Sequence, residues 1–206
     1  MLVTVEALER EVKRCSDGIL TIEYRTLLDA LDDYPLTQEI ADYLCKMIIA
    51  KKYIWEIRFD HLRPLLLNQT AKRFDLKHFY AERFSRSRRL CMKMYFLRGY
   101  AMYASEEETE KLCGKFIKAL TKTYDYIDYM DIISENGLQY LVRTYQYPCF
   151  FEAWETAQRE YEKIHPYLRG YMTTNAKLRH VQLLSSEEVW HCQQMFIDEP
   201  RKRNRG

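Results

Sequence analysis

Glycine and proline are scarce in this chain, which has six glycines and five prolines among its 206 residues. Together these two residues make up about 12% of an average protein, more than twice their share here. Because tight turns depend on them, their scarcity argues against a turn-rich β sandwich or barrel. The composition instead favours long helices joined by short connections.

The sequence also lacks the motifs that identify common enzymes. It has no G-x-x-x-x-G-K-[ST] loop, no G-x-G-x-x-G and no G-x-S-x-G. Its five histidines show no H-x-x-x-H spacing of the kind that binds metal. His191 and Cys192 are neighbours, and neighbours on a helix point about 100° apart, so they do not form a nucleophile–base pair. We therefore predict no catalytic residue, no cofactor and no metal.

Long apolar runs are missing as well. No window reaches 18 apolar residues, so we predict no membrane span. The opening MLVTVEALEREVKRC carries three glutamates and no long apolar core, and we do not expect it to be a secretory signal or a transit peptide. The six cysteines stand singly, without a C-x-x-C pair. This favours buried, reduced thiols in an intracellular compartment, most simply the cytoplasm.

Basic and acidic residues nearly balance, with 32 of the former and 30 of the latter, but they are unevenly spread along the chain. The net charge is +2, which gives the whole molecule no strong polyanion-binding signature. The stretch from Lys72 to Arg98, however, contains nine basic and two acidic residues. The stretch from Ser105 to Glu135 contains eight acidic and four basic residues. This segregation is more informative than the total charge.

The acidic stretch includes three aspartates, Asp125, Asp128 and Asp131, spaced one helical turn apart. Such a pattern is compatible with metal binding, but hard cations require several oxygens that converge from different directions. On a helical wheel Asp125 and Asp128 lie opposite the apolar residues of the same segment. The pattern therefore favours a solvated acidic face over a metal site.

The stretch 75–104, DLKHFYAERFSRSRRLCMKMYFLRGYAMYA, contains no proline and carries apolar residues at helical spacing. Further apolar residues lie on its opposite face, which is typical of a helix with partners on both sides. We predict an all-α, single-domain bundle of seven to nine helices around this long central helix. The predicted helical domain covers 1–199, and 200–206 is a basic C-terminal tail.

The remaining apolar residues also recur with helical periodicity. Two capping boxes mark helix starts, Ser105-x-x-Glu108 and Ser185-x-x-Glu188, and Pro64 is expected to break a helix. Beyond the central stretch, the main predicted helices cover 4–15, 20–31, 37–62, 105–133, 138–145 and 150–164.

The outer face of the central helix combines basic and aromatic side chains, which are common anchors of protein interfaces. Its predicted partner-binding residues are Arg86, Arg89, Lys93, Phe96, Tyr100 and Tyr103. On this ground the first hypothesis is a non-catalytic helical interaction protein, a structural or adaptor subunit of a larger intracellular assembly.

RNA binding is the second hypothesis. It uses the basic segment 72–98 and the tail Arg201–Arg205 for phosphate contacts. Tyr80, Phe96 and Tyr100 are the candidates for stacking on bases.

Binding of an anionic lipid or phosphate ligand is the third hypothesis. Four cations fall within apolar arcs: Lys51, Arg58, Arg83 and Arg98. Either their stems are buried while their heads reach water, or the heads converge on an anion. We expect Arg98 in particular to meet a specific anion, and Gly99 beside it to let a neighbouring backbone approach closely.

Overall fold

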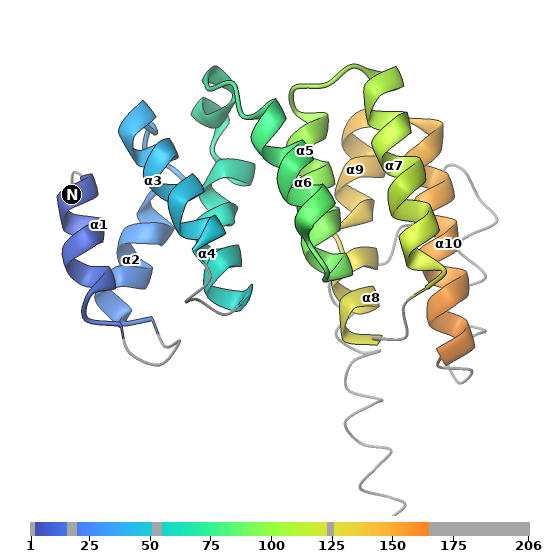
Figure 1. Cartoon of the computed structure of the whole chain (residues 1–206), viewed down its shortest axis with the longest axis horizontal. Coiled ribbons are helices and arrows are strands. Elements are labelled where there is room, and N and C mark those ends of the chain that lie inside the picture. Colours follow the sequence, from blue (N-terminus) through green and yellow to red (C-terminus); the bar gives the residue numbers. More distant parts are fainter. Residues whose placement is uncertain (1–2, 16–19, 51–54, 123–125, 165–206) are drawn as a thin grey trace, which may run out of the picture. The chain divides into compact units, whose positions relative to one another are not determined.

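The computed structural model describes residues 3–15, 20–50, 55–122 and 126–164 of the chain (Figure 1). Every regular element in those ranges is a helix and none is a strand, which confirms the predicted all-α, multi-helix fold. By compactness the chain divides into two units, Met1–Phe79 and Tyr80–Gly206. The predicted grouping of 1–199 into one domain stays a prediction. No helix within the described ranges is both long enough and apolar enough to span a bilayer.

Three helices of the first unit begin at threonines. Thr4, Thr21 and Thr37 each accept, through the side-chain oxygen, the N–H of the third helical residue at 3.2–3.3 Å. Each cap satisfies an amide that the first helical turn leaves unpaired. The described elements of this unit are α1 (Val5–Val12), α2 (Ile22–Ala30), α3 (Gln38–Ile49), α4 (Trp55–Leu67) and the 3₁₀ helix η1 (Gln69–Arg73).

A buried asparagine, Asn68, links two parts of the first unit. Its Nδ2 donates to the carbonyl oxygens of Leu31 at 2.7 Å and Tyr34 at 2.6 Å, just after α2. Its Oδ1 accepts from the N–H and the hydroxyl of Thr70, at 2.8 and 2.6 Å. The Thr70 hydroxyl oxygen in turn accepts the N–H of Leu36 at 2.9 Å. One amide therefore ties the α2–α3 connection to the α4–η1 turn.

The second unit is built around α10, which packs against α7, α8 and α9, while α6 packs on α7 and α8. The predicted capping box opens α7, because Ser105 N–H donates to Glu108 at 2.9 Å and Glu108 N–H donates to the Ser105 hydroxyl at 3.3 Å. The predicted box at 185–188 lies outside the described residues. The helices are α5 (Lys77–Arg86), which starts at the end of the first unit, α6 (Leu90–Ala101), α7 (Glu106–Leu120), α8 (Tyr126–Ile133), α9 (Leu138–Tyr145) and α10 (Pro148–Ile164).

The single helix predicted over 75–104 is wrong, because the structure has two helices, α5 and α6, with a break at Ser87–Arg89 (Figure 1). In a continuous helix the Phe84 carbonyl would accept the N–H of Arg88. Here it accepts the Lys93 ammonium at 2.7 Å instead, and the Ser87 hydroxyl bonds to the Arg89 carbonyl at 3.4 Å. The Lys93 side chain thus replaces one of the backbone hydrogen bonds that the helix loses at the break.

Two further long helices are also interrupted. The segment predicted as 37–62 is α3 and α4, since Ala50 has extended backbone. The segment predicted as 105–133 is α7 and α8, and the Leu120 carbonyl at the end of α7 accepts the Tyr129 hydroxyl. The break expected at Pro64 is wrong, because Pro64 lies inside α4, which continues past it to Leu67. Proline lacks only its own N–H, and its carbonyl still accepts Asn68 N–H at 3.0 Å.

Candidate functional site

The predicted partner-binding face is only partly exposed. Arg86 is exposed and Arg89 half-buried, but Phe96 is only 4% exposed. The ring of Phe96 therefore belongs to the interior, because α6 is buried on nearly all sides. Tyr100 and Tyr103 are half-buried, and the Tyr103 ring stacks on Tyr80 at 6.0 Å between centroids.

Lys93, also predicted to bind a partner, is engaged within the chain. Its ammonium donates to the Phe84 carbonyl and lies 4.7 Å from the centroid of the Phe84 ring. Burial lowers the pKa of this ammonium. Lys93 of α6 thus connects to α5 across the break between the two helices. A partner-binding role for the exposed part of this face stays a prediction.

The aromatic residues proposed to stack on RNA are poorly placed for it. Tyr80 is fully buried and Phe96 nearly so, whereas stacking requires an open ring face. Arg86, which is exposed at the end of α5, forms an ion pair with Glu82 at 2.9 Å. The predicted basic tail lies outside the described residues.

Three of the four cations considered for an anion site lie within the described residues. Lys51 lies outside the described residues, and Arg58 belongs to the first unit. Arg83 pairs with Glu82, its neighbour on α5, at 3.1 Å, not with a carboxylate of another helix. Among the residues that the structure describes, the buried Nε atoms of Arg58, Arg83 and Arg98 have no hydrogen-bond partner. No shared anion site follows from these positions.

Arg98 is the most deeply buried of these cations, at 3% exposed. Its Nη1 donates to the Asn136 carbonyl at 2.9 Å, and its guanidinium carbon lies 3.6 Å from the centroid of the Tyr140 ring. Desolvation lowers the pKa of Arg98, an effect that Tyr140 and Tyr95 oppose. Within the described residues no carboxylate pairs with it. The guanidinium therefore contacts the Asn136 carbonyl and the Tyr140 ring and not the predicted anion. These contacts connect α6 to α9 and the turn before it.

This arrangement predicts the outcome of two substitutions. Arg98→Met should change the free energy of unfolding by less than about 1 kcal/mol, since removing a buried charge offsets the lost contacts. Arg98→Lys should cost about 1–2 kcal/mol, because a buried ammonium cannot stack as the planar guanidinium does. Urea unfolding measures both. A loss of about 3–5 kcal/mol in Arg98→Met would instead reveal a buried anionic partner.

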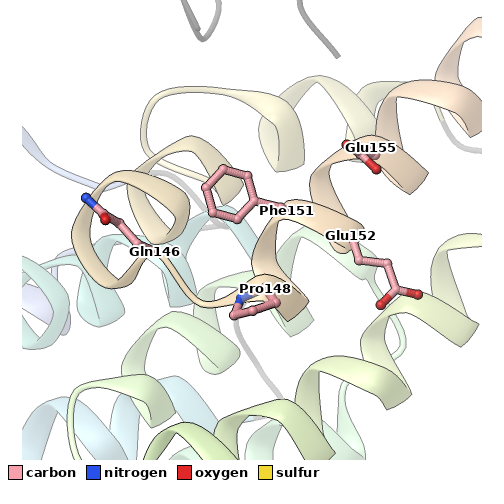
Figure 2. Close-up of a pocket in the computed structure, with 5 residues that line it drawn as sticks. All are labelled: Gln146, Pro148, Phe151, Glu152 and Glu155. Atoms are coloured by element: carbon pink, nitrogen blue, oxygen red, sulfur yellow. The ribbon is translucent and has the colours of Figure 1, made fainter. Parts of the chain in front are cut away.

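A pocket of about 370 Å³ lies where α9 meets α10, on a surface that the sequence did not predict as a site (Figure 2). It is lined by Gln146, Pro148, Phe151, Glu152 and Glu155. Figure 2 shows the Phe151 ring between Gln146 on one side and Glu155 on the other. The lining therefore combines an aromatic surface with two carboxylates.

Backbone geometry fixes the pocket's edge. Gln146 ends α9 in the left-handed conformation, with φ 56°, and its N–H donates to the Val142 carbonyl at 3.0 Å. Pro148 then opens α10 at the first helical position, where its fixed φ suits the helix and its missing N–H costs nothing. The rings of Tyr147 and Phe150 stack at 5.6 Å and brace the turn between them.

The carboxylates of the pocket are available to a ligand. Glu152 and Glu155 are exposed, and neither forms an ion pair within the described part of the chain. Phe151 is half-buried, so one part of its ring anchors it and another part faces the pocket. Within the described residues no group of three or more His, Cys, Asp or Glu side chains is placed to hold a metal ion. The pocket's chemistry is thus that of cation and apolar recognition.

A sequence signal for this pocket exists in retrospect. Pro148, Phe151, Glu152 and Glu155 follow the i, i+3, i+4, i+7 spacing of one helix face, opposite to the core stripe of Phe150 and Ala157. Gln146 carries no such signal, because its left-handed conformation is not typical of glutamine.

The chain matches no protein-family model, no curated protein and no solved structure. Its function is therefore inferred from the chemistry of its own surfaces.

Proposed function

We propose that this protein is a non-catalytic helical interaction protein, a structural or adaptor subunit that binds a basic segment of a partner protein. The observation that carries the proposal is the pocket at the start of α10, with Phe151 beside Glu152 and Glu155. An arginine or lysine of the partner pairs with these carboxylates while its stem and an adjacent apolar residue cover the Phe151 ring.

The electrostatic surroundings support a basic partner. Glu106 and Glu110 of α7 act on the Cys149 thiol, whose pKa they tend to raise, so they lie close to the start of α10. Both glutamates are exposed. The acidic first turns of α7 therefore extend the negative potential of the pocket, which attracts a basic segment and repels an acidic one.

A pair of peptides tests the proposal. We expect a labelled peptide of alternating arginine and leucine to bind saturably, whereas the same peptide with glutamate in place of arginine does not bind. Replacing both pocket carboxylates, Glu152→Lys with Glu155→Lys, should weaken binding by about tenfold or more, equivalent to about 1.4 kcal/mol. Fluorescence anisotropy at fixed ionic strength measures each dissociation constant.

The matched control is Glu9→Lys with Glu23→Lys. These two residues are exposed on the first unit and free of ion pairs in the described chain, so the net charge changes equally. We expect this control to alter the affinity by less than about twofold. Equal weakening by both double variants would show non-specific attraction. Tighter binding of single-stranded polyuridine, with a steep salt dependence, would support RNA binding and overturn the proposal.

A further inference from the structure

Two buried cysteines meet beneath the start of α10. The thiol of Cys113, in α7, donates to the backbone carbonyl of Cys149 at 3.2 Å. Cys113 is fully buried and Cys149 is 7% exposed, and both are free thiols. Their helices pack against each other. The geometry therefore places one thiol directly beside the residue that carries the other.

The two thiols are not equivalent. The interaction between the two side chains lowers the pKa of Cys149 and raises that of Cys113. Cys149 is the second residue of the 17-residue helix α10, where the helix dipole favours a negative charge. Cys149 is thus the more readily ionised thiol, and Cys113 is placed to react with it in a second step.

We propose that Cys149 and Cys113 form an oxidative modification site, in which a peroxide converts the pair into a reversible disulfide between α7 and α10. The Cys149 thiolate attacks a peroxide oxygen, breaks the O–O bond and becomes a sulfenic acid as hydroxide leaves. The Cys113 sulfur then attacks the Cys149 sulfur and displaces its oxygen as water. The two sulfurs lose two electrons, the peroxide gains them, and two waters form from hydrogen peroxide and the two thiol protons. A dithiol reductant reverses the link by exchange.

Cys45 of α3 provides a control thiol in the same molecule. Burial, with the nearby Asp42, raises the pKa of Cys45 to about 12, so it stays protonated at neutral pH. A thiol reacts with peroxide as its thiolate. The first unit thus carries a cysteine that should resist an oxidant to which Cys149 responds.

Peptide mapping of the full chain tests the site without any partner. Trypsin separates Cys113, in Leu112–Lys115, from Cys149, in Thr144–Arg159. After hydrogen peroxide and alkylation of the remaining thiols, we expect these two peptides to be disulfide-linked, and dithiothreitol to release them. The Cys149 thiol should disappear about tenfold faster than the Cys45 thiol.

Single variants separate the two steps. Cys113→Ser should leave Cys149 at the sulfenic acid, which dimedone traps, and Cys149→Ser should leave Cys113 reduced. Wild-type mapping is decisive even if a variant fails to fold. Absence of the Cys113–Cys149 link in peroxide-treated wild-type protein, or oxidation of Cys149 no faster than Cys45, overturns the proposal. Since no partner takes part, this result is independent of the pocket's binding function.

Discussion

Asn68→Ala is expected to destabilise the protein by about 3 kcal/mol or more. The Asn68 side chain is 3% exposed and makes four hydrogen bonds, two as a donor to the Leu31 and Tyr34 carbonyls and two as an acceptor from Thr70. Alanine removes all four at once. A buried polar group left without its partner costs about 1–3 kcal/mol, and several such groups are orphaned together. Urea unfolding followed by circular dichroism measures the loss.

Two further variants test whether the lost hydrogen bonds cause the destabilisation. Asn68→Asp keeps an acceptor for Thr70 but loses the donor to Leu31 and Tyr34, so it too should be clearly destabilised. The control is Gln38→Ala, since the Gln38 amide bonds to Asp42 at 2.8 Å on an exposed face of α3. Exposed substitutions of this kind usually change stability by about 0.5 kcal/mol or less. If Asn68→Ala costs no more than Gln38→Ala, the network does not hold the first unit together.

Local signals in the sequence located helix starts well. The Thr37 cap and the Ser105–Glu108 capping box act between residues three apart, so the sequence contains everything that forms them. Apolar periodicity likewise identified the buried stripe of α10. The all-α fold was predictable because these signals depend only on near neighbours along the chain.

Helix breaks were not predictable in the same way. The α5–α6 break depends on the Lys93 ammonium reaching the Phe84 carbonyl, nine residues back in the chain. The end of α7 involves a hydroxyl from α8, that of Tyr129. Hydrophobic periodicity takes no account of a side chain that replaces a backbone donor. A wheel drawn through 75–104 as one helix therefore assigned Phe96 to the exposed side, whereas its side chain is buried.

The candidate sites show the same difference between local signals, which the sequence contains, and contacts between residues far apart in the chain, which it does not. Arg98 was correctly singled out as a cation within an apolar arc, but its contacts, the Asn136 carbonyl and the Tyr140 ring, come from 38 residues away and beyond. The pocket depends on the left-handed backbone at Gln146, which sets the direction in which α10 leaves α9. The sequence thus showed that a cation lies among apolar residues, whereas the fold determined which groups contact it.

Gly99 illustrates the difference between a predicted position and its observed neighbour. The sequence predicts that a backbone approaches Gly99 closely, but the group that does so is the Tyr80 ring. A Cβ at position 99 would overlap the Cε1, Cδ1 and Cζ atoms of that ring. The ring is fully buried and stacked on Tyr103, so it has no open space into which to move.

Gly99→Ala is therefore expected to destabilise the protein by about 2 kcal/mol or more, although alanine is the better helix former. Helix propensity favours alanine by about 1 kcal/mol, but overpacking a core costs about 1–3 kcal/mol, and a rigid buried ring places this site at the upper end or beyond. Gly114→Ala in α7 is the matched control, because a Cβ there meets nothing within 4 Å. It should raise stability by up to about 1 kcal/mol. Thermal and urea unfolding should thus shift in opposite directions for the two variants, and a gain in both would show that Tyr80 does not pack on Gly99.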